Sequence, residues 1–288
     1  MLTTEELRQI QRLSIQLNRR VDSPFAGEYR RAFRGQGMEF EEVRAYVPGD
    51  DIRHIDWNVT ARSDQPFIKV FREERELTVM LVLDISGSMR VGSGGQDGRT
   101  DKRLQAARLA GALAYAAIRN QDRVGLATFT DRVEKLVPPR KARGHAWGVI
   151  REAFAGDPRR RGTALGEVLE QVGRLLKRRA VVCVLSDFLG ESDWRRPLAV
   201  LGRRHQVSAF LLHDPLEAAL PGVRLVELED AETGRRRLVD AVSLRARVPL
   251  EVRLRDLRRA GARARAVGTD EDPFRELLAH FRSVERRR

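Results

Sequence analysis

The sequence predicts an α/β protein with a doubly wound, mostly parallel sheet, preceded by a separate segment of helix and short strands. Two observations support this prediction. Residues 78–83 and 180–185 are nearly continuous runs of aliphatic and β-branched side chains, which are typical of strands buried on both faces. Stretches of helical composition such as 102–120 alternate with these runs, and this alternation requires crossover connections between parallel strands.

The N-terminal segment is expected to comprise residues 1–76, and the α/β part residues 77–288. In the first, apolar residues among polar ones predict an amphipathic helix at 5–20. Glycine, proline and charge are abundant at 23–64 and predict irregular structure with short strands, whereas the alternation at 66–71 predicts a strand.

In the α/β part, the Ala/Leu-rich stretch 102–120 predicts a helix. Residues 223–229 and 235–239 flank a turn sequence and predict a hairpin, and the alternation at 262–267 predicts an edge strand. By the same criteria the remaining expected elements are strands at 78–83, 123–130, 133–137, 180–185 and 206–212, and helices at 145–154, 164–179, 194–204, 249–260 and 273–284.

Composition limits the possible functions. The chain has 288 residues, a net charge of +13 and 42% hydrophobic residues, enough to bury a core. Lysines number only five, so arginine supplies most of the positive charge, and it is scattered among acidic residues as on a solvated surface. Aromatic residues make up 6% and do not interleave with basic ones, so we expect no nucleic-acid binding.

The cellular location is predicted from three features that the sequence lacks, namely a membrane-spanning run, a signal peptide and a pair of cysteines. No apolar run approaches the roughly 18–20 residues that span a bilayer, and the acidic start is unlike a signal peptide. The single cysteine, Cys183, lies in an expected strand and cannot form an internal disulfide. We therefore expect a cytoplasmic protein without membrane insertion.

The strongest local signal is a set of oxygen-bearing side chains at expected strand ends. Asp84, Ser86 and Ser88 alternate directly after one buried strand, and Asp187 follows another. Thr163 precedes the helix that leads into the second strand. Because ligands of open α/β sheets gather at the carboxyl ends of strands, these groups should share one edge, where their hard oxygen atoms suit Mg²⁺ or Mn²⁺.

Each of these residues also has a purely structural interpretation. Asp84 could form a strand-end turn, Ser86 and Ser88 could cap the next helix, and Thr163 could be an N-cap. All five residues together, in this order and on these elements, favour metal binding.

The pattern Asp84-x-Ser86-x-Ser88, followed by Thr163 and Asp187, resembles the metal-ion-dependent adhesion site of von Willebrand factor type A domains. This resemblance covers residues 77–288 and implies that the first and fourth strands are neighbours. It also implies that Ser86, Ser88 and Thr163 touch the metal, that Asp84 and Asp187 act partly through water, and that one coordination position stays open for a carboxylate from a partner.

The N-terminal part adds a second resemblance. Residues 34–57, RGQGMEFEEVRAYVPGDDIRHIDW, and residues 66–74, PFIKVFREE, resemble the bacterial family of unknown function numbered fifty-eight (DUF fifty-eight). Members are commonly encoded beside MoxR-type AAA+ ATPases. The resemblance therefore implies a non-enzymatic protein-interaction module that acts with such an ATPase, or its client, in chaperone-like maturation of complexes.

Two other interpretations remain open at this point. The oxygen cluster could serve a metal-dependent hydrolase, although the sequence supplies no motif for a base or for a P-loop. Residues 49–56 contain His54 among carboxylates and could be catalytic, but we favour a buried polar cluster that joins this segment to the α/β part. We therefore expect no catalytic residues and no organic cofactor.

Overall fold

The computed structural model describes residues 24–33, 38–63, 65–73, 76–90, 92, 100–156, 162–189, 193–217, 225–229, 236–240 and 249–285. The chain divides into two compact units, one made of Met1–Phe33 with Thr78–Arg288 and the other of Arg34–Leu77. The helix expected at 5–20 lies outside the described residues.

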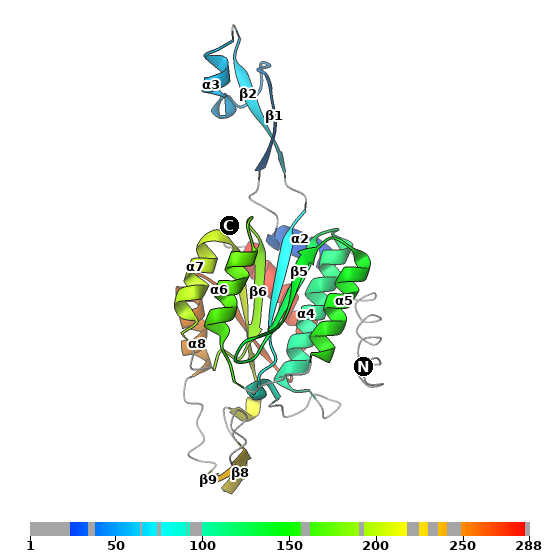
Figure 1. The fold of residues 1–288 in the computed structure, drawn as a ribbon, viewed down its shortest axis with the longest axis vertical. Coiled ribbons are helices and arrows are strands. Elements are labelled where there is room, and N and C mark those ends of the chain that lie inside the picture. The colour runs from blue at the N-terminus through cyan, green and yellow to red at the C-terminus, as the bar shows by residue number, and fades with distance from the viewer. Residues whose placement is uncertain are drawn as a thin grey trace. The chain divides into compact units, whose positions relative to one another are not determined.

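The larger unit is built on a six-stranded sheet in the order β10-β7-β6-β3-β4-β5 (Figure 1). Its strands are β3 (Thr78–Asp84), β4 (Arg123–Phe129), β5 (Val133–Arg140), β6 (Val181–Ser186), β7 (Gln206–His213) and β10 (Arg263–Gly268). Neighbouring strands are parallel except for β5, which pairs antiparallel with β4. This arrangement confirms the predicted fold class.

The strand order also bears on the resemblance to von Willebrand factor A domains. The first and fourth strands of the sheet in chain order, β3 and β6, are neighbours, as that resemblance implied. The chain runs from β3 to β4 on one side and from β6 to β7 on the other. The gap between β3 and β6 is therefore the switch point where ligands of such sheets bind.

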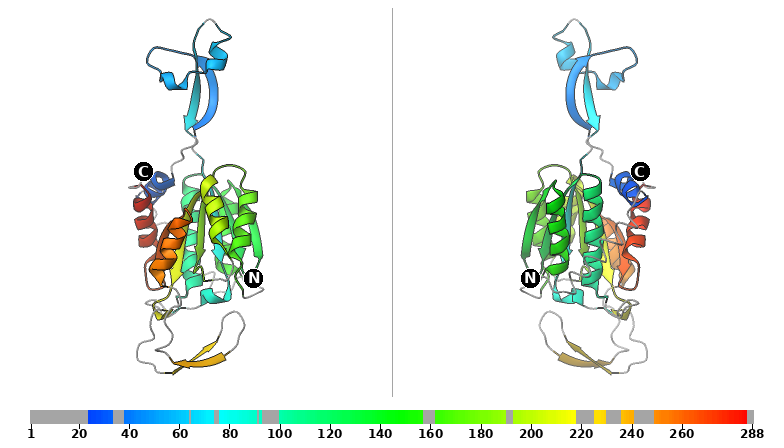
Figure 2. Two further views of the ribbon diagram at one scale, coloured as in Figure 1. Left: turned by 90° about the vertical axis from the view of Figure 1, so that its left-hand side faces the viewer. Right: turned by 90° about the vertical axis from the view of Figure 1, so that its right-hand side faces the viewer.

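Helices cover both faces of the sheet (Figure 2). One face carries α6 (Leu165–Leu175), α7 (Arg195–Arg204) and α8 (Leu250–Arg259), whose apolar side chains pack on alternate residues of the strands, such as Met80 and Val82. The other layer consists of α4 (Lys102–Arg119), α5 (Arg143–Ala155), α9 (Pro273–Glu285) and α2 (Pro24–Phe33). Cys183 is fully buried in β6.

Helix α2 corrects the predicted N-terminal organisation, because residues 23–64 were expected to hold no helix. The rings of Tyr29 and Phe33 meet Phe281 of α9 edge-on, at centroid distances of 5.9 and 5.2 Å. This helix therefore belongs to the larger unit and not to the N-terminal segment. Tyr29, Ala32 and Phe33 have helical spacing, but the two arginines between them and the glycine before them hide the pattern.

The smaller unit contains an antiparallel pair, β1 (Met38–Ala45) and β2 (Phe67–Glu73), with the short helices η1 (Ile52–His54) and α3 (Trp57–Thr60). The polar segment 49–56 is not the buried cluster that we expected. Asp51 and Arg53 are exposed and pair with each other, whereas Asp56 is buried and accepts hydrogen bonds from the backbone N–H groups that begin α3.

Two further predictions are confirmed at the other end of the chain. Strands β8 (Leu225–Glu229) and β9 (Arg236–Asp240) pair antiparallel, as the hairpin prediction required. Strand β10 lies at the edge of the large sheet. Within the part of the chain that the structure describes, no helix is both long and apolar enough to cross a membrane.

Replacing Phe33 tests whether α2 is part of the larger unit. Phe33→Ala should lower the free energy of unfolding by about 3–5 kcal/mol, because it leaves a cavity between α2 and α9. Arg30→Ala, at an exposed position of the same helix, is the control and should cost much less. Equal, small effects in urea denaturation would show that α2 does not contribute to this core.

His280 should make the larger unit sensitive to acid. Its ring is buried in α9, with Nε2 2.9 Å from Oγ of Ser208, and burial together with Arg265 and Arg263 lowers its pKa from 6.5 to about 3. Because the unfolded chain takes up this proton more readily, its contribution to stability is complete above pH 6.5. It then falls by about 1.4 kcal/mol per pH unit between 6.5 and 3.

His280→Gln removes this titration, so its melting temperature should fall less steeply with decreasing pH than that of the wild type. Parallel pH profiles for the two proteins would contradict this assignment.

Candidate metal centre

The turn after β3 brings three of the predicted residues together. The backbone N–H of Ser86 donates to Oδ1 of Asp84 at 2.9 Å, and Oγ of Ser186, at the end of β6, donates to Oδ2 at 2.5 Å. The short helix η2 (Gly87–Arg90) then places Oγ of Ser88 3.2 Å from Oγ of Ser86. Asp84 and Ser86 are fully buried, whereas Ser88 is half-buried.

Asp187 reaches the same edge from the neighbouring strand. Its Oδ2 lies 2.7 Å from Nζ of Lys102, and its Oδ1 accepts a hydrogen bond of 3.1 Å from the backbone N–H of Leu189. The same ammonium group forms an ion pair with Glu217. Lys102 stands in the first turn of α4, and its side chain is only 1% exposed.

Thr163 lies one strand further along the edge. The backbone N–H of Ala164 donates to the carbonyl of Thr130, directly after β4, at 2.8 Å, and β4 is the neighbour of β3. Thr163 is half-buried and is not the N-cap of α6, because Ala164 occupies that position. Its segment is therefore held at the same edge of the sheet as Asp84.

The two serines likewise do not cap the next α-helix. The N-cap of α4 is Asp101, whose side chain accepts a hydrogen bond of 2.6 Å from the backbone N–H of Leu104. Ser86 and Ser88 lie beside the end of β3, more than ten residues before the start of α4 at Lys102.

The electrostatics of the site follow from two buried carboxylates at neighbouring strand ends. Burial and, to a smaller extent, the negative charge of Asp187 raise the pKa of Asp84 to about 7, although hydrogen bonds from Ser186 and Ser86 oppose the shift. For Lys102, burial would lower the pKa, but the charges of Asp187 and Glu217 outweigh it and raise the pKa above the ordinary value. Lys102 is therefore a permanent cation within the site.

The donor set fits a small divalent cation. Octahedral Mg²⁺ holds its ligands at about 2.1 Å, so that adjacent ligands lie about 3 Å apart, close to the separation of the two serine hydroxyl oxygens. When Asp84 is ionised, the three carboxylates of Asp84, Asp187 and Glu217, less the charge of Lys102, leave two negative charges, which would match one divalent ion. The resemblance to von Willebrand factor A domains implies that Ser86, Ser88 and Thr163 would supply direct ligands and that Asp84 and Asp187 would act partly through water.

Lys102 and Glu217 were not among the predicted site residues. Lys102 belongs to an Ala/Leu-rich helix, and Glu217 lies in η3 (Pro215–Glu217), 115 residues further along the chain. The one feature of the sequence that could have drawn attention to Lys102 is that the chain contains only five lysines. Nothing in the spacing of Glu217 connects it to the strand ends.

The fold and this edge define a doubly wound α/β protein with the strand adjacency of von Willebrand factor A domains and a cluster of oxygen-bearing side chains at its switch point. The chain belongs to the DUF58 family, described as protein of unknown function DUF58, whose model matches residues 42–260.

The chain is also similar to an uncharacterized bacterial protein and, in fold, to a solved structure. An uncharacterized protein of Mycobacterium bovis, Mb1516, is 32% identical over 225 residues, which cover 77% of this chain and 69% of that protein. The crystal structure of the conserved hypothetical protein BatB from Bacteroides thetaiotaomicron is 18% identical, with a TM-score of 0.50. The match covers 73% of this chain and 99% of that one. At this identity the likeness supports the fold alone.

Removing the buried ammonium group should strongly destabilise the larger unit. Lys102→Met leaves Asp187 and Glu217 without their shared cation and should cost about 3–5 kcal/mol of unfolding free energy. The control is Lys135→Met, because Lys135 is half exposed in its ion pair with Glu152, where the loss should stay below about 1 kcal/mol. Similar losses in both variants would show that the buried pairs have no special role.

Proposed function

We propose that the protein is a non-enzymatic protein-interaction module whose binding surface is completed by Mg²⁺ or Mn²⁺ at the edge between β3 and β6. The observation that carries this proposal is the pair of hydroxyl oxygens of Ser86 and Ser88, 3.2 Å apart beside two buried carboxylates. Hydroxyl ligands leave a bound cation electrophilic, so that it can accept a carboxylate of a partner at its open position.

The chain's own residues have separate tasks in this proposal. Asp84 orients the turn through its hydrogen bonds with Ser86 and Ser186, and the half-buried Ser88 holds its hydroxyl 3.2 Å from that of Ser86. Lys102 holds Asp187 in place and lowers the local negative charge. A bound cation is therefore held less tightly and can be exchanged.

We further propose that the partner supplies a Glu or Asp and is a MoxR-type AAA+ ATPase or the client of one, in the cytoplasm. This part rests on the DUF58 family resemblance. The hydrolase alternative gains no support from the site. Lys102 is held protonated by two carboxylates, and Asp84 is fully buried with both of its oxygens hydrogen-bonded, so neither is placed to act as a base toward a substrate.

The proposal predicts a measurable metal site. In a calorimetric titration with Mg²⁺, Ser88→Ala should bind at least about tenfold more weakly than the wild type, because a direct ligand is lost, while thermal melting in chelator stays unchanged. Ser63→Ala removes an exposed hydroxyl in the smaller unit and serves as the control.

The partner is tested in the same variants. Capture of the purified ATPase should require Mg²⁺ and should weaken alike with chelator and with Ser88→Ala. Undiminished capture under both conditions would show that recognition does not use the metal. Steady hydrolysis of ATP or a phosphoester that is lost in Ser88→Ala would favour the hydrolase.

A further inference from the structure

We propose that the outer edge of β10 is a docking site for an extended, acidic segment of a partner protein, which adds to the large sheet as a further strand. This surface is separate from the metal centre, and the inference does not depend on the proposed function.

Strand β10 ends the sheet, with β7 on its inner side. The backbone N–H of Thr269 donates to the carbonyl of His213 at 3.0 Å, so this position faces β7. In a parallel ladder the N–H and C=O of one residue point to the same side, and successive residues alternate. The main-chain groups of Ala264 and Ala266 therefore point outward.

These outward groups are available for pairing. Among the described residues, no hydrogen bond reaches the N–H or C=O of Ala264 or Ala266 from the outer side. The next outward position is already satisfied, since the N–H of Gly268 donates to a carboxylate oxygen of Glu271 at 2.7 Å and its carbonyl accepts from Gln105 at 2.8 Å. The open part of the edge thus has two donors and two acceptors, which is the pattern that an added strand uses.

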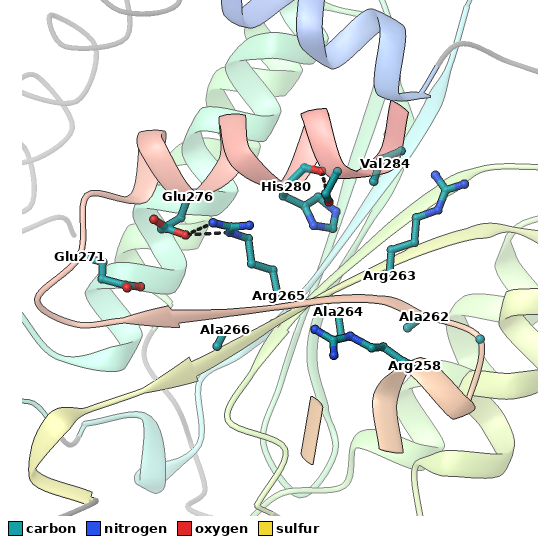
Figure 3. Close-up of a pocket in the computed structure, with 12 residues that line it drawn as sticks. Arg258, Ala262, Arg263, Ala264, Arg265, Ala266, Glu271, Glu276, His280 and Val284 are labelled. Carbon is teal, nitrogen blue, oxygen red and sulfur yellow. Dashed lines mark hydrogen bonds and ion pairs between the residues drawn. The ribbon is translucent and has the colours of Figure 1, made fainter. Parts of the chain in front are cut away.

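The edge lies in a groove and not on a flat surface. Figure 3 shows β10 between α9, which carries Glu276 and His280, and α8, which carries Arg258. The cavity along the strand has a volume of about 520 Å³. Ala264 and Ala266 bring only methyl groups to it, so a partner backbone can approach to hydrogen-bonding distance.

The charges of the groove select an acidic occupant. Three arginines line it, Arg258, Arg263 and Arg265, against two glutamates. Glu276 and Arg265 neutralise each other in an ion pair, with Nε of Arg265 2.7 Å from the carboxylate, and Glu271 accepts a hydrogen bond from the N–H of Gly268, so the remaining lining charges are Arg258 and Arg263 against Glu271. Positive charges along an edge strand oppose pairing with a basic strand and favour pairing with an acidic one. Arg258 of α8 is exposed at the rim of the groove, where it can contact an acidic side chain of the added strand.

Hydrogen exchange on the full chain tests the proposal directly. The probe is a blocked peptide of alternating glutamate and valine, and its lysine–valine counterpart is the charge control. On binding the acidic peptide, the amides of Ala264 and Ala266 should become protected, whereas those of Arg265 and Val267, which already face β7, should change little. The lysine peptide should protect neither.

Variants separate main-chain pairing from charge. Ala264→Pro removes an outward N–H without breaking the ladder to β7, and it should weaken binding of the acidic peptide about tenfold. Arg258→Glu should also weaken it, whereas Arg259→Glu, at an exposed neighbouring position that does not line the groove, should not.

The proposal is overturned if the acidic peptide leaves the exchange of Ala264 and Ala266 unchanged. It is also overturned if the lysine peptide binds equally well, or if the two arginine variants behave alike. The exchange measurement on the wild type decides the question even if Ala264→Pro fails to fold.

Discussion

The closeness of two buried carboxylates, Asp84 and Asp187, is the constraint on which the arrangement of the site depends. It arises because β3 and β6 are neighbours and end at the same edge. Burial disfavours the charged form of Asp84, and the like charge of Asp187 adds to this effect, so the pKa of Asp84 is raised. Neighbouring groups offset the repulsion between the two carboxylates. Ser86 and Ser186 donate hydrogen bonds to Asp84, and the ammonium group of Lys102 pairs with Asp187.

Lys102 links this edge to the rest of the larger unit. Its helix, α4, packs on one face of the sheet, and its ammonium group joins the end of β6 to Glu217 after β7. This internal cation offsets part of the negative charge of the three carboxylates. The ammonium group of Lys102 therefore contributes to the stability of the fold and also sets the net charge of the site.

The two surfaces of the larger unit use different physical chemistry. The edge between β3 and β6 offers side-chain oxygens at strand ends, where a cation and a carboxylate can meet. The outer edge of β10 offers main-chain groups between flanking arginines. Both proposed interactions would favour acidic protein segments, one through a metal ion and the other through strand pairing.

The sequence by itself determined the alternation of strands and helices, the edge position of β10 and the position of the five oxygen-bearing residues at one edge of the sheet, because apolar runs and strand-end motifs are local patterns. It missed α2, whose few apolar residues are separated by arginines and become a helix face only against Phe281. It also missed Lys102 and Glu217, and it misjudged the burial of Asp51 and Arg53. Tertiary structure decided these points, since burial and ion pairing depend on which distant segments meet, and spacing along the chain carries no record of that.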